Sequence, residues 1–152
     1  MKPVRLIKFK RKKIMYVIEY ATEINTKDTK ILLDGLSVHA KASKDLAPAE
    51  QFAFFLRDHE KKIIGGCEGS IYYGCIFVDL LWVAASIRNQ GYGSRLMREA
   101  EKLGRDKYCL FMAVNTMDWE GLEFYKKLGF EVEFVRKGYS KDSTAYFLRK
   151  NL

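Results

Sequence analysis

The sequence predicts a single α+β domain, built on a mixed, mostly antiparallel, twisted sheet with helices on both faces. Three observations carry this prediction. A chain of 152 residues with 48% hydrophobic side chains suits one compact domain that buries most of its apolar surface. Short apolar runs rich in β-branched and aromatic residues alternate with segments of helical period. No internal repeat and no Pro- or Gly-rich linker divides the sequence.

The first half of the chain is expected to hold a strand, a helix and three further strands. The run IMYVIEYA, residues 14–21, is apolar and β-branched and predicts a strand. From Thr26 the apolar period becomes that of a helix, with Thr26 or Asp28 as its cap. After a loop with Pro48, the runs FAFFLRD and KKIIGGCEGS predict two strands around the turn residues 58–61. The long apolar run GCIFVDLLWV predicts a central strand buried on both faces.

The second half of the chain alternates helices and strands. A helix is expected over residues 94–103, with an apolar stripe and with Gly104 closing it in the left-handed conformation. Because this helix joins GCIFVDLLWV to the buried run YCLFMAV, these two strands should be parallel, with a right-handed crossover. A second helix is expected over residues 120–128, ending at Gly129. The runs FEVEFVRKG and STAYFLRK then predict a hairpin around YSKD.

Positive charge is concentrated at the N-terminus. The formal net charge is +8, and residues 1–13, MKPVRLIKFKRKK, contain seven Lys or Arg and no acid. The other residues hold 20 basic and 19 acidic side chains, so that part is nearly neutral. We therefore separate a basic N-terminal segment, 1–13, from a domain, 14–152. The segment is expected to be a solvated arm or an edge strand, although contact with nucleic acid is the alternative. No DNA-reading helix accompanies it.

The cysteines indicate a reducing compartment. Cys67, Cys75 and Cys109 have no CxxC spacing and lie in apolar runs, which predicts reduced, buried thiols. Only His39 and His59 could assist them in binding a metal, so no metal site is expected. No run approaches the ~20 apolar residues of a membrane span, and the N-terminus lacks the apolar stretch of a signal peptide. We expect a cytoplasmic protein without membrane contact.

The stretch RNQGYG, residues 88–93, lies where a buried strand is expected to end and a helix to begin. Backbone N–H groups at the head of a helix point outward at the positive end of its dipole and form an anion site. Gly91 and Gly93 would let the main chain approach a phosphate closely, because a Cβ would hold the ligand away. The stretch is no P-loop, since no GK[ST] follows. The dinucleotide fingerprint also fails, because its third glycine would fall at Leu96.

In its context this stretch resembles the acyl-CoA loop of the GNAT acetyltransferase superfamily. The pattern Arg88-x-x-Gly91-x-Gly93 follows the strand VDLLWV, and LEFYKKLGF comes one strand later. The similarity spans residues 63–150, and the order of the earlier elements agrees with it. It implies acetyl-CoA as the cosubstrate, no metal, and a sheet splayed between its two parallel strands.

The resemblance also implies which residues bind coenzyme A. Main-chain amides of the glycine loop would hold the pyrophosphate, and the strand before the loop would pair with the peptide-like pantetheine arm. Asn115 would hydrogen-bond the same arm, with a turn or cap as its alternative role. The residues assigned in this way are Leu81, Trp82, Val83, Arg88, Asn89, Gln90, Gly91, Tyr92, Gly93, Ser94, Asn115 and Tyr125.

The catalytic acid is implied by the same resemblance, whereas the base has several candidates. Tyr125 would protonate the departing CoA thiolate; its alternative role is aromatic packing beside Phe124 and Phe130. The attacking ammonium must first lose a proton. Asp79 is expected to be buried among apolar neighbours, and burial would raise its pKa toward that of a useful base. Glu68 and a water chain to solvent are the competitors, and either acid could instead pair with a Lys or Arg.

The predicted function is acetyl-CoA-dependent N-acetyl transfer to a primary amine of a small molecule or protein, directly within a ternary complex. Main-chain amides near Val83 would polarise the thioester carbonyl. Aromatic side chains on the acceptor side would suit an amine with an apolar or cationic portion, although plain packing is their alternative role; they are Tyr72, Tyr73, Trp119 and Tyr139. A homodimer through the C-terminal hairpin is a further expectation. The rival functions are a non-catalytic acyl-CoA sensor and a basic nucleic-acid-binding protein.

Several positions depart from the pattern of the superfamily. Ala84 and Ala85 stand where acidic residues are usual, and Asn89 stands where a glycine is common. The stretch MDWEGL brings Trp119 and Glu120 close to the expected acceptor mouth. These changes leave the coenzyme A residues intact and leave the identity of the amine open.

Overall fold

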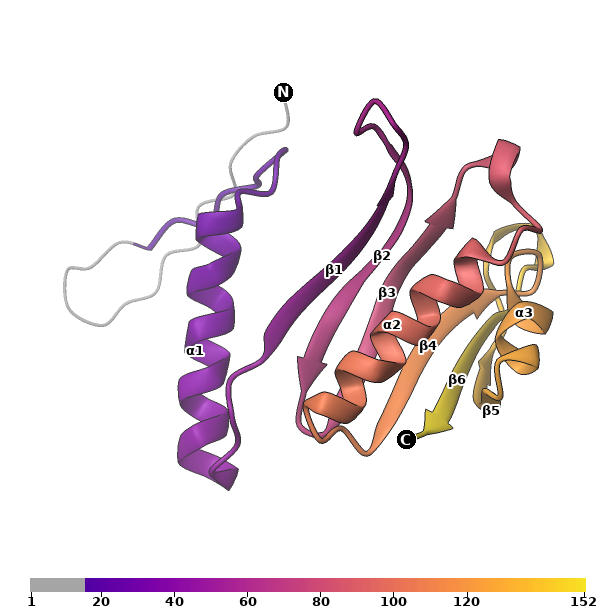
Figure 1. Ribbon diagram of the computed structural model, residues 1–152. Coiled ribbons are helices and arrows are strands. Elements are labelled where there is room, and N and C mark those ends of the chain that lie inside the picture. Colours follow the sequence, from indigo (N-terminus) through magenta and orange to yellow (C-terminus); the bar gives the residue numbers. More distant parts are fainter. Residues whose placement is uncertain (1–15) are drawn as a thin grey trace. The chain divides into compact units, whose positions relative to one another are not determined.

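The computed structural model describes residues 16–152 (Figure 1). The chain divides into two compact units, residues 1–36 and 37–152. The strand expected at 14–21 is wrong for the part that is described, because residues 16–21 adopt no strand. Nothing in 16–152 pairs with this segment, and a β-branched composition needs a hydrogen-bonding neighbour to become a strand. The basic segment 1–13 lies outside the described residues.

Helix α1, Thr26–Lys44, confirms the helix expected from Thr26 but corrects its cap. The side-chain oxygen of Asn25 accepts the N–H of Lys27 at 2.9 Å, and the Asn25 carbonyl accepts the N–H of Thr29 at 3.0 Å. Asn25 is therefore the cap, rather than Thr26 or Asp28, since an Asn side chain satisfies a free N–H of the first turn.

Six strands form one sheet in the order β1-β2-β3-β4-β6-β5. All neighbouring strands are antiparallel except β3 and β4, which are parallel, as the sequence predicts. The bounds are β1 Glu50–Arg57, β2 Ile63–Tyr72, β3 Cys75–Val83, β4 Phe111–Met117, β5 Glu131–Arg136 and β6 Ala145–Asn151. The predicted α+β fold with a mixed sheet is confirmed, as is the C-terminal hairpin of β5 and β6.

Helix α2, Tyr92–Asp106, makes the crossover from β3 to β4. It is longer than predicted, and Gly104 does not end it. A Cβ at Gly104 would lie 2.7 Å from Ile76 Cγ2 and 2.8 Å from Leu152 Cδ1, so this glycine lets the helix approach the sheet closely. The left-handed residue after the helix is Tyr108, with φ 57°. Helix α3, Leu122–Lys127, is followed by Gly129 with φ 88°, as predicted.

The core lies between the central strands and the apolar sides of α2 and α3. The most deeply buried side chains come from β3, β4 and β6: Ile76, Met112, Val114 and Leu148. All three cysteines are buried free thiols, as expected. Burial raises the pKa of Cys67 and of Cys75 to about 11, which keeps both thiols protonated and unreactive near neutral pH.

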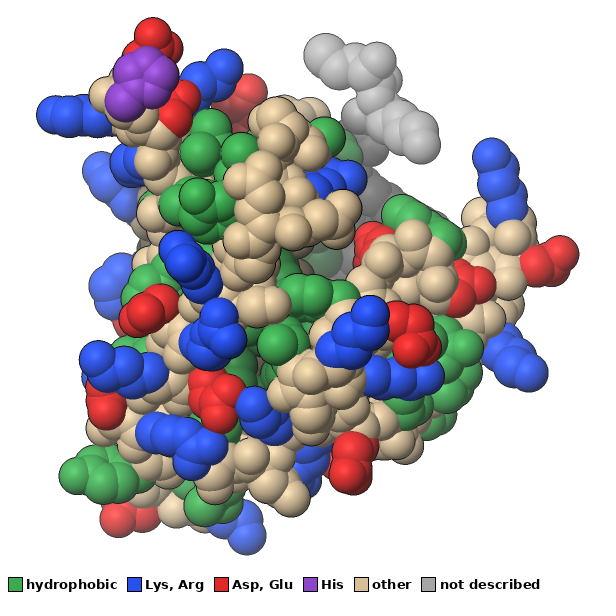
Figure 2. Space-filling model, turned by 45° about the vertical axis from the view of Figure 1, so that its right-hand side comes forward, with side chains coloured by type: hydrophobic (Ala, Val, Ile, Leu, Met, Phe, Trp, Pro, Cys, Tyr) green, Lys and Arg blue, Asp and Glu red, His purple; other side chains and the backbone are tan. Residues whose placement is uncertain are grey.

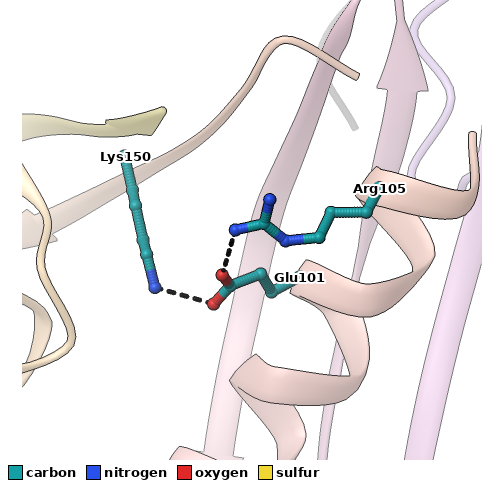
Figure 3. Close-up of polar contacts among 3 residues, drawn as sticks. All are labelled: Glu101, Arg105 and Lys150. Carbon is teal, nitrogen blue, oxygen red and sulfur yellow. Dashed lines mark hydrogen bonds and ion pairs between the residues drawn. The ribbon is translucent and has the colours of Figure 1, made fainter. Parts of the chain in front are cut away.

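An ion-pair network ties α2 to β6 (Figure 3). The carboxylate of Glu101 accepts hydrogen bonds from Lys150 at 2.7 Å and from Arg105 at 2.9 Å. Burial alone would raise the pKa of Glu101, but these two hydrogen bonds and their positive charges outweigh it and hold the pKa below its usual value. The network therefore contributes to stability as long as Glu101 is ionised.

The surface carries both signs of charge. Figure 2 shows a face on which Lys and Arg side chains are interspersed with Asp and Glu. This matches the near balance of acids and bases after residue 13. Within residues 16–152 there is no helix of the length and apolarity that crossing a membrane requires.

Candidate active site

The two parallel strands separate halfway along their length. Pairing of β3 with β4 runs from Cys75 opposite Phe111 to Val78 opposite Val114 and then stops. Beyond that point β3 pairs only with β2, and β4 pairs only with β6 (Figure 1). Within residues 16–152, no strand uses the facing backbone groups of 79–83 and 115–117. The splayed sheet expected from the resemblance is thus present.

A β-bulge at Asp79 coincides with this separation. Glu68 lies opposite Leu80 and Gly69 lies opposite Val78, which leaves Asp79 without an opposing residue. Gly69 makes the bulge possible, because a Cβ there would lie only 1.9 Å from the carbonyl oxygen of Phe77. A bulge bends its strand and re-aims a side chain, and bulges are frequent beside active sites.

The bulge also corrects the prediction that β3 is buried on both faces. The strand is buried or half-buried from Cys75 to Val78, but Asp79, Leu80 and Trp82 are exposed. Leu81 and Val83 still pack against the core. The apolar composition indicated burial along the whole strand, whereas separation from β4 leaves its second half uncovered.

The glycine loop leads from β3 into the head of α2. After a short 3-10 turn, the Nε of Arg88 donates to the Val83 carbonyl at 3.0 Å and closes the loop on itself. Asn89 and Gly91 both have positive φ, 60° and 83°. Gly91 is the N-cap of α2 and accepts the first helical hydrogen bond, from the N–H of Arg95 at 3.0 Å.

The head of α2 is open. No side chain caps it, and none of the N–H groups of residues 91–94 donates to another group within 16–152. A Cβ at Gly91 would meet nothing within 4 Å, so the space in front of this residue is free. Four free donors at the positive end of a 15-residue helix form a site for an anion of phosphate type.

The two glycines of the loop differ in their surroundings. Gly91 is needed for its left-handed φ. A Cβ at Gly93 would lie 3.4 Å from the ring of Phe124 in α3, which is an ordinary contact distance. The role of Gly93 in the approach of a phosphate stays a prediction.

Tyr125 lies in α3 and is buried, with 8% of its surface exposed. Its ring packs edge-on against Phe124 and Phe130, with centroids 5.2 and 5.7 Å away. Burial, followed by the charge of Glu120 and the proximity of Cys67, raises the pKa of the Tyr125 hydroxyl to about 12. The Tyr125 hydroxyl has no hydrogen bond within 16–152. Since no fully buried side-chain oxygen or nitrogen in that range lacks a partner, this hydroxyl is not itself fully buried. It therefore reaches solvent-accessible space as a protonated O–H.

The two candidate bases lie together beside a cavity. Asp79 and Glu68 line an open cavity of about 330 Å³, together with Gln51, Phe52, Ala53 and Gly69. The prediction that Asp79 is buried is wrong, because its side chain is exposed at the bulge. Partial exclusion of water by neighbouring atoms, and then the charge of Glu68, still raise the pKa of Asp79. Neither acid forms an ion pair with a Lys or Arg within 16–152.

The other residues predicted for the site are Asn115 and the aromatic residues on the acceptor side, and only Asn115 lies beside the gap between β3 and β4. Asn115 does not end its strand, since β4 continues to Met117, but it is the first residue of β4 beyond the pairing with β3. The aromatic residues expected around the acceptor do not line the cavity. Tyr72 and Tyr73 pack edge-on against each other at the β2–β3 turn, and Trp119 is 70% exposed.

Sequence reasoning missed the polar residues Gln51 and Thr116. Gln51 lines the cavity from β1 and had no motif to mark it. Thr116 is the only polar residue classed as buried within 16–152. A threonine inside an apolar strand run, AVNTM, was the available signal for it.

An open strand edge that leads into an uncapped helix head can accommodate an extended, amide-containing ligand with a phosphate group. The acetyltransferase (GNAT) family matches residues 17–130, which is more than half of the chain. The chain therefore belongs to the GNAT acetyltransferase family, as the resemblance indicated.

Individual relatives agree with this assignment. The chain is 32% identical over 106 residues to blasticidin-S acetyltransferase of Streptomyces morookaense, covering 69% of this chain and 78% of the relative. An acetyltransferase structure from Bacillus cereus matches with a TM-score of 0.71 and 26% identity, covering 88% of this chain and 98% of that one. A GNAT family acetyltransferase from Elizabethkingia anophelis with acetyl-CoA bound shares the fold, with a TM-score of 0.59 and 17% identity, covering 88% and 95%.

Proposed function

We propose that this protein transfers an acetyl group from acetyl-CoA to a primary amine, directly within a ternary complex. The observation that carries this proposal is the edge of residues 79–83 left unpaired by β4, which the glycine loop connects to the uncapped head of α2. A strand with free amide and carbonyl groups suits the two amides of pantetheine, and the free N–H groups that follow suit a diphosphate. The bound acetyl-CoA of the Elizabethkingia relative, which shares this fold, supports the choice of cosubstrate.

In this proposal, the binding residues are those of β3, of the glycine loop and of β4 beside the split. Backbone groups of Leu81, Trp82 and Val83 pair with the arm, and the loop from Arg88 to Ser94 binds the diphosphate. Asn115 lies on the other side of the split, because it is the first residue of β4 beyond the pairing with β3, while it still pairs with Phe147 of β6. Arg88 keeps the loop closed through its bond to Val83.

The thioester of acetyl-CoA supplies an electrophilic carbonyl. The amine nitrogen forms a bond to that carbon, and the main-chain N–H of Val83 stabilises the charge on its oxygen. The C–S bond then breaks as the carbonyl re-forms, the electron pair leaves on sulfur, and the nitrogen releases its second proton to solvent. The Tyr125 hydroxyl donates to this sulfur.

The high pKa of the Tyr125 hydroxyl determines how this residue assists the departure of the thiolate. A thiol has a pKa of about 8.5, below the value of about 12 for Tyr125, so complete proton transfer to sulfur would be uphill. The hydroxyl therefore acts first as a hydrogen-bond donor that stabilises the developing thiolate. Because it is never ionised near neutral pH, this donor is always available.

Asp79 is the preferred base, assisted by Glu68. The amine arrives as an ammonium and must lose one proton before it attacks. An exposed carboxylate with a raised pKa can accept that proton and pass it to solvent through the open cavity. Two carboxylates on one cavity also favour an acceptor with positive charge. Because the Streptomyces relative is named blasticidin-S acetyltransferase, blasticidin S is one of the amines to test as an acceptor.

A thiol-release assay tests the proposal. The purified chain is incubated with acetyl-CoA and a panel of amines, including polyamines, aminoglycosides, amino acids and blasticidin S, and free CoA is measured. Tyr125→Phe should lower kcat by ~10²-fold or more while the Kd for acetyl-CoA changes little. Measurable binding of acetyl-CoA with no thiol release for any amine would instead favour the sensor.

A further inference from the structure

The connection between β4 and α3 is held by two side chains. One carboxylate oxygen of Glu120 accepts the N–H of Met117, the last residue of β4, at 2.9 Å. The same oxygen lies 3.4 Å from the Thr116 hydroxyl, which in turn accepts the N–H of Gly121 at 3.1 Å. A backbone hydrogen bond from the N–H of Glu120 to the carbonyl of Met117, 3.1 Å, completes the turn.

This turn determines where Tyr125 lies. The carbonyl of Gly121 accepts the N–H of Tyr125 at 3.0 Å, which is the first helical hydrogen bond of α3. The Tyr125 ring rests against Gly121, because a Cβ at that glycine would lie 3.2 Å from the ring atom Cε2. Gly121 thus contacts Tyr125 through both its backbone and its open face, and Thr116 fixes Gly121.

We propose that Glu120 and Thr116 are positioning residues for the transfer, which hold the turn 117–121 so that the Tyr125 hydroxyl stays directed at the leaving sulfur. This inference rests on the proposed function. Neither side chain needs to touch acetyl-CoA or the amine. Helix α3 has only six residues and no side-chain cap of its own at Gly121, so its placement depends on these contacts from the preceding turn.

Burial and charge agree with the proposal. Thr116 is buried, with 5% of its surface exposed, so loss of its hydroxyl leaves the Gly121 N–H without its acceptor. After burial, the charge of Glu120 is the next cause that raises the pKa of Tyr125.

Paired substitutions test the proposal, each with a conservative counterpart. Glu120→Gln keeps an oxygen acceptor for the Met117 N–H, whereas Glu120→Ala removes it. Thr116→Ser keeps the hydroxyl, whereas Thr116→Val removes it. Glu123→Ala is the matched control, because Glu123 is an exposed α3 residue whose carboxylate pairs only with Lys126 within 16–152.

Two readouts are needed, kcat with an active amine and the NMR ring signal of Tyr125. The signal is observed in protein with ¹³C-labelled tyrosine and assigned by its loss in Tyr125→Phe. Glu120→Ala and Thr116→Val should shift or broaden this signal and lower kcat about tenfold, with less than a threefold change in KM for acetyl-CoA. The Gln, Ser and control variants should retain the signal and most of kcat.

The results separate this inference from the proposed function. An unmoved Tyr125 signal in both Glu120→Ala and Thr116→Val overturns the positioning role, whether or not the enzyme is active. A loss of kcat in Glu120→Gln as large as in Glu120→Ala, with the signal unmoved, overturns it in favour of a charge effect. If the unaltered chain releases no thiol with any amine, the proposed function fails, and the NMR signal alone decides the inference. If a variant does not fold, its conservative counterpart and the other pair still give the comparison.

Discussion

Gly91 has a backbone conformation in the glycine loop that glycine adopts far more easily than other residues. Its φ of 83° is accessible to glycine, whereas an alanine in this conformation costs about 1–2 kcal/mol. The chain either pays this strain or rotates the loop, and rotation would turn the N–H groups of residues 91–94 away from a diphosphate.

Gly91→Ala should therefore weaken binding of acetyl-CoA, measured by calorimetry, by about tenfold or more. Gly138→Ala is the matched control, because Gly138 has φ 91° and equally open space but lies between β5 and β6. It should lower the melting temperature to a similar extent and leave the Kd unchanged. Equal affinity in both variants would remove the loop from the binding site.

The raised pKa of Asp79, to which Glu68 contributes, predicts that the rate of transfer depends on pH. The pKa of Asp79 is raised above its usual 3.8, and only the ionised form can accept a proton. The rate at saturating substrate should fall as the pH drops through this pKa. Glu68→Gln removes one cause of the shift, so the same fall should occur at a lower pH.

Asp79→Asn should abolish this acidic limb and lower kcat by about 10²-fold. Asp106→Asn, an exposed acid at the end of α2, serves as the control and should keep the wild-type profile. A limb that persists unchanged in Asp79→Asn would assign proton removal to a water chain or to the amine itself.

At the scale of elements, the bulge depends on a single glycine. A Cβ at Gly69 would lie 1.9 Å from the Phe77 carbonyl oxygen, which is backbone and cannot rotate away. Gly69→Ala should therefore force β2 and β3 apart or out of register. We expect a loss of about 3 kcal/mol or more in the free energy of unfolding, measured with urea. Gly35→Ala, in α1 with nothing within 4 Å, should instead be neutral or stabilising by up to about 1 kcal/mol.

The helices and strands were largely predictable because their signals are local. The period of apolar residues located α1, α2 and the strands from β1 to β6, and Gly129 ended α3 as expected. The strand at 14–21 failed because its formation depends on a neighbour, which composition does not report. The prediction that Gly104 ends its helix failed because this glycine serves close packing against Ile76, a contact distant in sequence.

The sequence located the glycine loop between β3 and α2, but it did not report how exposed the residues near the loop are. Asp79 appeared buried because its neighbours in the sequence are apolar, yet a bulge and the separation from β4 expose it. Both features depend on pairing between strands, so no pattern within β3 contains them. The contacts of Thr116 with Glu120 and Gly121 were likewise invisible, since they arise from a turn geometry.

At the scale of the whole molecule, the network of Glu101, Arg105 and Lys150 fastens α2 to the C-terminal strand (Figure 3). Because the pKa of Glu101 is lowered in the folded state, its contribution is complete above the unfolded-state pKa of about 4.3. The contribution is lost as the pH falls through the lower pKa of the folded state.

Glu101→Gln should reduce the free energy of unfolding at pH 7 by about 1–2 kcal/mol, and the difference from the unaltered protein should shrink below pH 4. Glu123→Gln, whose carboxylate is 73% exposed, should change stability by less than about 0.5 kcal/mol. A difference that stays constant from pH 7 to pH 3 would show that the ionised network contributes nothing.

The gap between β3 and β4 makes the six-stranded sheet an incomplete one that a small molecule can finish. In the proposed complex, the cosubstrate would act as an extra strand supplied from solution, and it would stabilise the native state by about 2.7 kcal/mol at a concentration of one hundred times its Kd. Deuterium uptake at the amides of residues 79–83 and 115–117 should then slow on addition of acetyl-CoA, while the β1–β2 pair remains unaffected. The stability of the strands beside the gap would therefore increase with the concentration of acetyl-CoA.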